Sequence, residues 1–143
     1  MTRTQATRIL RASPEQVFEA ISNVENLPQT NPEIVTVELL TLQRSGKGTR
    51  FRETRRMGKR QLVGDYEITA YDAPKRMRVV TDNHGTIWDT VFHVRPVPEG
   101  AELELVMDAR AHSLVPRLLN PLMKGLFAKG LEAHLDALQD YLE

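Results

Sequence analysis

Two charged residues fall on the side of a predicted strand that should be apolar. Residues 49–57 have the alternation of a β-strand, with Thr49 and Phe51 on one side. Strict alternation puts Glu53 and Arg55 on the same side. A charged pair in a closed core is costly to desolvate, so these residues indicate either a water-accessible cavity or the open end of a strand. The alternative is a β-bulge after Phe51, which would turn both side chains outward.

Two side chains are candidates for acid–base chemistry. Glu53, with Arg55 beside it, is the first. His134 is the second, because it falls on the apolar side of a predicted C-terminal helix, where its imidazole could face the sheet. A hydrogen-bonded core histidine is the alternative for His134. His112 lies just before the helix, near the expected rim of a cavity.

Other inward-facing positions mix aromatic rings with hydroxyl and amide groups. Small-molecule sites are built this way, with mostly apolar walls and a few placed polar groups. Methionines at such a site can adapt to different apolar ligands, although they could equally be simple core residues. The expected ligand-binding residues are Phe51, Arg55, Tyr66, Thr81, Asn83, Thr86, Trp88, Thr90, Phe92, Met107, Met123 and Phe127.

Several kinds of site lack a signature in the sequence. The chain has no cysteine, no His-x-x-x-His pair, no glycine-rich phosphate loop and no serine nucleophile motif. We therefore expect neither a metal nor a cofactor.

Charge and hydropathy indicate which partners and which cellular compartment to expect. The 143 residues include 19 basic and 19 acidic ones, so net charge favours neither nucleic acid nor an anionic membrane as partner. No apolar run has the ~18 residues needed to span a bilayer, and the N-terminus lacks the apolar core of a signal peptide. We expect a cytoplasmic protein that is a monomer or a weak homodimer.

Two segments could instead bind a protein partner. Residues 50–60 carry six basic side chains, which are interpreted as a solvated hairpin edge or as a site for an anionic ligand. Residues 113–120 are interrupted by Pro116, and they could form an irregular lid over a cavity or an exposed apolar patch.

The end of the chain predicts one long helix. From Leu119 to Leu142, apolar residues recur every three or four positions with charged residues between them. Asn120 and Pro121 predict its start, because asparagine caps helices and proline suits the first helical position. A helix of about 22 residues would be roughly 33 Å long and would need an apolar surface to pack against.

Most of the chain before this helix predicts β-structure. Residues 2–11 form the first expected strand, and Ser13, Pro14 and Gln16 predict a short capped helix after it. Six further strands follow, separated by short turns. Because short turns join only antiparallel neighbours, we expect a seven-stranded antiparallel sheet with the long helix against its concave face.

This order of elements resembles the START-like superfamily, which has the helix-grip fold and includes polyketide cyclase/dehydratase-like proteins. The resemblance implies an α+β fold, a single ligand-binding domain over residues 1–143 and a cavity between sheet and helix. Its motifs are turns and caps, so they specify the fold and not an activity. The matching stretches are residues 12–18, 46–49, 73–77, 92–96, 100–103 and the terminal helix.

Three functions follow as hypotheses. The first is binding of a small hydrophobic molecule, such as a polyketide, isoprenoid, lipid or aromatic metabolite. The second is a cyclase or dehydratase reaction that uses Glu53 or His134 as acid or base. The third is binding of a protein partner through the basic hairpin or the segment around Pro116.

Overall fold

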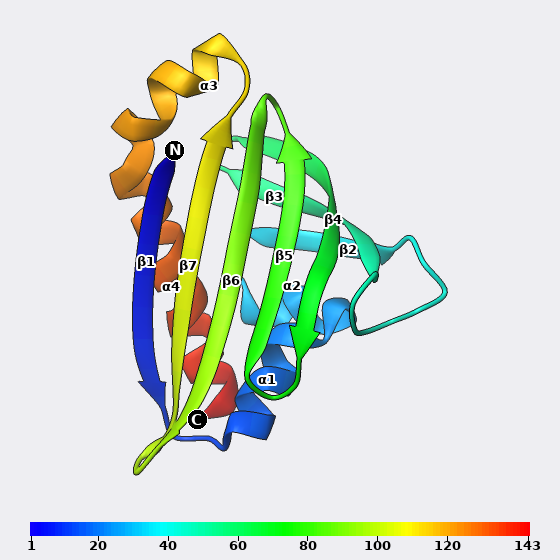
Figure 1. Ribbon diagram of the computed structural model, residues 1–143, viewed down its shortest axis with the longest axis vertical. Helices are drawn as coiled ribbons and strands as arrows, with labels where there is room; N and C mark the ends of the chain where they lie inside the picture. The colour runs from blue at the N-terminus through cyan, green and yellow to red at the C-terminus, as the bar shows by residue number, and fades with distance from the viewer.

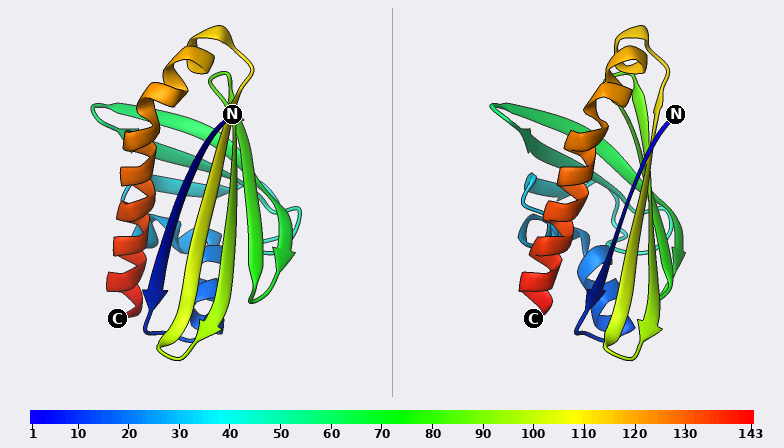
Figure 2. Two further views of the ribbon diagram at one scale, coloured as in Figure 1. Left: turned by 60° about the vertical axis from the view of Figure 1, so that its left-hand side comes forward. Right: turned by 90° about the vertical axis from the view of Figure 1, so that its left-hand side faces the viewer.

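The computed structural model describes the backbone of residues 1–143 and every side chain except that of Met57. A curved antiparallel sheet of seven strands wraps around the C-terminal helix, as the helix-grip fold predicts (Figures 1 and 2). The spatial order is β1-β7-β6-β5-β4-β3-β2, so only β1 and β7 are neighbours across the sheet without following each other in the chain. The strands are β1 (Thr2–Leu10), β2 (Ile34–Leu39), β3 (Arg50–Met57), β4 (Arg60–Asp72), β5 (Arg76–Asn83), β6 (Thr86–Val97) and β7 (Gly100–Ala111).

Short helices follow β1, and the first of them begins as the sequence predicts. The Ser13 hydroxyl accepts a hydrogen bond from the Gln16 backbone N–H at 3.1 Å, and the Gln16 side chain accepts one from the Ser13 N–H at 2.9 Å. This reciprocal pair satisfies N–H groups that the first turn leaves free. The helices are α1 (Pro14–Ser22), η1 (Val24–Asn26), α2 (Leu27–Thr30), α3 (Leu114–Leu119), η2 (Asn120–Met123) and α4 (Lys124–Leu142), where η denotes a 3₁₀ helix.

The start of the C-terminal helix differs from the prediction. Asn120 is not the N-cap of the long helix; it follows α3 as its C-cap, and its buried side-chain amide donates to the Thr86 hydroxyl at 3.2 Å. Residues 120–123 form a 3₁₀ turn, and the α-helix begins only at Lys124. The segment around Pro116, expected to be an irregular lid or an exposed apolar patch, is the short helix α3, and its large apolar side chains are exposed. Pro116 is compatible with α3 because it lies in the first turn, where the N–H groups have no helical partner.

The main core lies between the sheet and the C-terminal part of α4. Leu135 and Leu138 of α4 are fully buried, as are Leu103 and Leu105 of β7. Helix α4 runs along β1 and inside the curve of the sheet (Figure 2). No helix in the described structure combines the length and apolar composition that crossing a bilayer requires.

Candidate functional site

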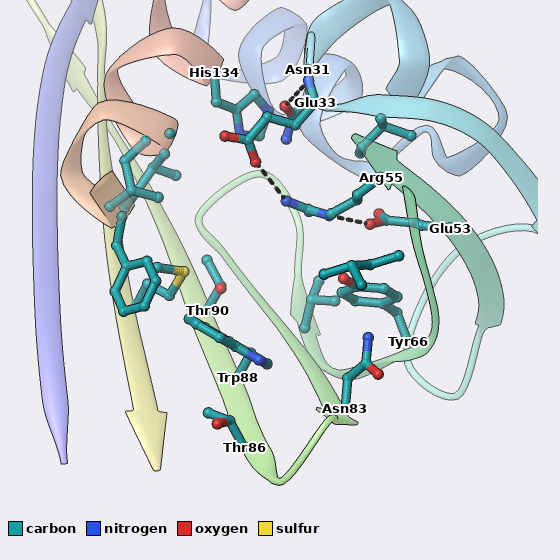
Figure 3. Close-up of a pocket in the computed structure, with 18 of the residues that line it drawn as sticks. Asn31, Glu33, Glu53, Arg55, Tyr66, Asn83, Thr86, Trp88, Thr90 and His134 are labelled. Carbon is teal, nitrogen blue, oxygen red and sulfur yellow. Dashed lines mark hydrogen bonds and ion pairs between the residues drawn. The ribbon is translucent and has the colours of Figure 1, made fainter. Parts of the chain in front are cut away.

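A cavity of about 340 Å³ lies between the inner face of the sheet and the helices α3, η2 and α4 (Figure 3). Aromatic rings form two of its walls. Trp88 of β6 meets Phe127 of α4 edge to face, with ring centroids 4.9 Å apart. Phe51 and Tyr66, opposite each other on β3 and β4, stack at 5.7 Å. These contacts make the walls largely apolar.

The register of β3 decides where its charged residues point. β3 pairs with β4 without interruption, and Phe51, Glu53 and Arg55 all line the cavity. The irregularities fall elsewhere, in β2 between Ile34 and Thr36 and in β4 after Ile68. A bulge after Phe51 is therefore wrong, and strict alternation gives the correct orientation. Only 3% of Glu53 is exposed.

Arg55 is the centre of a polar corner in this apolar cavity. Its Nε donates to Glu53 Oε2 at 2.8 Å, and its Nη1 lies 3.4 Å from Glu33 Oε2 (Figure 3). The guanidinium carbon lies 5.6 Å from the centre of the Tyr66 ring, close enough for a cation–π contact. Burial alone would lower the pKa of Arg55, but the effects of Glu53, Tyr66 and Glu33 together outweigh burial, and the pKa is raised. Arg55 is therefore a permanent cation.

Tyr66 contributes a neutral phenol to the same corner. Burial raises its pKa to about 12, against the opposing effect of Arg55. The hydroxyl group therefore keeps its proton at neutral pH and can donate a hydrogen bond.

Glu33 is a cavity residue that sequence reasoning missed. It lies in the loop before β2, where its backbone N–H donates to Asn31 Oδ1 at 3.1 Å. Its carboxyl group packs against α4 at Gly130, where an added Cβ would lie only 2.7 Å from Glu33 Oε1. A glycine on the inward side of the predicted helix was the one sequence signal for this close approach.

His134 brings a buried nitrogen to the cavity from α4. The residue is 8% exposed, its ring is edge-on to Phe92 at 6.2 Å, and its Nε2 has no hydrogen-bond partner among the described side chains. Burial, and secondly the charge of Arg55, lower the pKa of His134 to about 3. The imidazole is therefore neutral at pH 7, and such a low pKa makes it a poor general base there.

The structure brings nearly all of the predicted site residues together. Thr81 is buried but does not line the cavity, because its hydroxyl donates to the backbone carbonyl of Asp65 at 2.6 Å. His112 is also away from it, exposed and 2.7 Å from Asp82. The predicted residues that do line the cavity are Phe51, Glu53, Arg55, Tyr66, Asn83, Thr86, Trp88, Thr90, Phe92, Met107, Met123, Phe127 and His134. Their roles in binding or catalysis stay predictions.

Comparison with known families agrees with this architecture. The model of a family described as "Polyketide cyclase / dehydrase and lipid transport" matches residues 1–143. The chain belongs to this family. Its fold is the helix-grip fold, which it shares with the solved structure of a START superfamily protein. Among curated proteins, none matches the sequence.

Solved structures similar to this family member share its fold at low sequence identity. A START superfamily protein from Mycobacterium smegmatis has a TM-score of 0.83 and 20% identity, over 98% of this chain and 96% of the other. The protein TTHA0849 from Thermus thermophilus has a TM-score of 0.79 and 20% identity, over 99% of this chain and 97% of the other. Ara h 8.0201 has a TM-score of 0.72 and 12% identity, also over 99% of this chain and 97% of the other. At these identities the likeness extends to the fold alone.

Proposed function

We propose that the cavity binds a small, uncharged and mostly hydrophobic molecule that carries at least one hydroxyl group. The observation that carries the proposal is the composition of the polar corner. Two carboxyl groups, Glu33 and Glu53, face one guanidinium, and His134 beside them is neutral. The corner has a formal charge of −1 inside walls that are otherwise largely apolar.

The walls would supply most of the binding free energy. Burial of apolar surface contributes about 25 cal/mol per Å². Aromatic or isoprenoid skeletons would gain this energy against Phe51, Trp88 and Phe127, which line the cavity.

The polar corner would select the functional group. Ligand hydroxyl groups can donate to the Glu33 and Glu53 carboxylates, and they can pair with the unsatisfied Nε2 of His134 in either tautomer. A ligand carboxylate would instead meet an excess of negative charge in a poorly solvated site. Phenolic polyketides and isoprenoid alcohols therefore fit better than fatty acids.

Trp88 gives a direct test because it is the only tryptophan and it lines the cavity. Titration with 1-naphthol should change its fluorescence with saturation at one molecule per chain. 1-Naphthoate, which has the same rings and a carboxylate in place of the hydroxyl, should bind at least about tenfold more weakly, a difference of about 1.4 kcal/mol. Tighter binding of the naphthoate, or no saturable change with either compound, would refute the proposal.

An acid–base activity is the second candidate, and the observation in its favour is the carboxyl group of Glu53 within the cavity. A β-hydroxy ketone would lose a proton from the carbon next to the carbonyl and then a hydroxide as water. The probe is 3-hydroxy-1-tetralone, which loses water to give 1-naphthol. Glu53→Gln should abolish any acceleration by the wild-type protein. Equal rates with and without the wild-type protein would exclude this activity for the probe.

A further inference from the structure

Basic residues are concentrated in two segments of this electrically balanced chain. Residues 54–64, at the β3–β4 hairpin, and residues 112–131, from the end of β7 into α4, contain seven of the 19 basic residues and none of the 19 acidic ones. The rest of the chain is left with 12 basic residues against 19 acidic ones. Net charge therefore conceals a strong separation of charge.

Six of these seven cations are free to meet a partner. Arg55 is held in the cavity by Glu53 and Glu33. The others are exposed, and among the described side chains none of them pairs with an acidic group. These six are Arg56, Lys59, Arg60, Arg117, Lys124 and Lys129.

Large aliphatic side chains are exposed on the second of the two segments. Between 45% and 81% of each of them is accessible to solvent, the most exposed being Leu122. They follow one another along α3, η2 and the first turn of α4. We call this set the leucine ridge: Leu114, Val115, Leu118, Leu119, Leu122 and Leu126.

Both segments border the same cavity. Leu62, beside the hairpin, lines it from one side, while Val115, Leu119 and Leu126 of the leucine ridge line it from the other. Figure 2 shows α3 and the β3–β4 hairpin at the same end of the molecule, on either side of the start of α4. The two segments that carry the free cations and the leucine ridge therefore lie at one end of the molecule, and both border the cavity.

We propose that this end of the molecule docks on an anionic phospholipid bilayer. The leucine ridge would enter the boundary between head groups and acyl chains, and the six free cations would contact the phosphates. A hydrophobic ligand could then pass between bilayer and cavity without crossing water. The proposal concerns the surface and does not depend on which ligand the cavity takes.

The apolar part of the surface favours a bilayer over nucleic acid or an acidic protein. Single-stranded nucleic acids are bound by aromatic side chains on which bases stack, and the exposed apolar residues here are all aliphatic. Charge pairing with an acidic protein would explain the cations but not why six aliphatic side chains next to them remain in solvent.

The test is flotation of the full chain with vesicles of phosphatidylcholine alone and with 30% phosphatidylglycerol. The protein should float with the anionic vesicles at low salt and far less with the neutral ones. Replacing Arg56, Lys59 and Arg60 together by Gln should weaken binding about 100-fold, because each charge near the surface contributes about fivefold. The matched control replaces Lys47, Lys75 and Arg76 by Gln, exposed cations outside both segments, and should bind as the wild type does.

A second pair of variants tests the leucine ridge. Leu118→Gln with Leu122→Gln should reduce flotation at least tenfold, whereas Leu42→Gln, at a fully exposed leucine in the β2–β3 loop, should not. All of these sites are exposed, so the variants should fold, which circular dichroism checks. Absence of flotation, equal loss in the control variants, or binding of RNA or polyglutamate in preference to anionic vesicles would overturn the proposal.

Discussion

The two halves of the inner face of the sheet follow the same alternation but have opposite character. Toward the β6–β7 turn, Val94 and Leu103 point inward, each is at most 4% exposed, and neither lines the cavity. Toward the other end of the sheet, the inward positions include Glu53, Arg55 and Thr90, which line the cavity. We call these halves the closed half and the open half. The comparison indicates that alternation sets the direction of a side chain, while the covering helices decide whether it meets a core or a cavity.

The largest effect is expected in the closed half. Leu103→Ala removes a fully buried side chain that does not line the cavity, and it should lower the free energy of unfolding by about 2–5 kcal/mol. Urea denaturation measures this loss. Val63→Ala, at a half-exposed position on the outer face of β4, is the control and should change stability by less than about 0.5 kcal/mol. Similar losses in the two variants would contradict the assignment of Leu103 to a packed core.

A smaller loss is expected when the polar corner of the open half is broken. Glu53→Gln keeps the shape of the side chain but leaves the Arg55 guanidinium without its closest carboxylate. We expect a loss of about 1–3 kcal/mol in urea denaturation, typical of a buried polar partner that is removed. Asp65→Asn breaks the Arg52–Asp65 pair on the outer face of the sheet and should have a much smaller effect, because that pair is solvated. An effect of Glu53→Gln no larger than that of Asp65→Asn would mean that the corner is effectively in water.

His134 predicts a loss of stability in mild acid. Its native pKa of about 3 is below the value of 6.5 expected in the unfolded chain, so between these pH values only the unfolded state binds the proton. Stability from this group is complete above pH 6.5 and falls by about 1.4 kcal/mol for each pH unit below it. Between pH 6.5 and 5 the wild type should therefore lose about 2 kcal/mol more than His134→Gln does. His93→Gln, at an exposed histidine, should follow the wild type. Parallel curves for the wild type and His134→Gln would show that the imidazole is solvated.

The smallest predicted effect concerns the contact between α4 and Glu33. Gly130→Ala improves helix propensity by about 1 kcal/mol, but the new Cβ would meet the Glu33 carboxyl group. The gain should be nearly cancelled in the wild type and recovered in a Glu33→Ala background. A double-mutant cycle should give a coupling of about 0.5–1 kcal/mol. If the effects of the two substitutions on stability were additive, the Glu33 carboxyl group would not contact the helix at Gly130.

Much of this architecture was predictable because it depends on local chemistry. The Ser13 cap, the short turns and the period of two in the strands are properties of a few neighbouring residues. The orientation of Glu53 and Arg55 also followed from counting along β3. What remained open was whether a bulge interrupts that count, and bulges depend on how neighbouring strands fit together.

The rest depends on contacts between segments far apart in the chain. Asn120 has the sequence of a helix cap, yet its amide bonds to Thr86, 34 residues away, and the helix begins later. Glu33 enters the site only because the loop before β2 crosses α4 at a glycine. Alternation along β5 predicts that Thr81 faces the cavity, but its hydroxyl donates a hydrogen bond to the backbone of Asp65 in the neighbouring strand β4. Neither periodicity nor composition contains these long-range pairings.

The central claim, that the open half binds an uncharged hydrophobic molecule, is tested most directly by native mass spectrometry of the protein isolated from its own host. We predict one bound molecule per chain, extractable into organic solvent and carrying a hydroxyl but no carboxyl group. Thr90→Phe, which fills the cavity, should lose this molecule, while Thr36→Phe on the exposed side of β2 should keep it. An extracted carboxylic acid, equal retention by both variants, or an unliganded mass that does not shift with added 1-naphthol would contradict the claim.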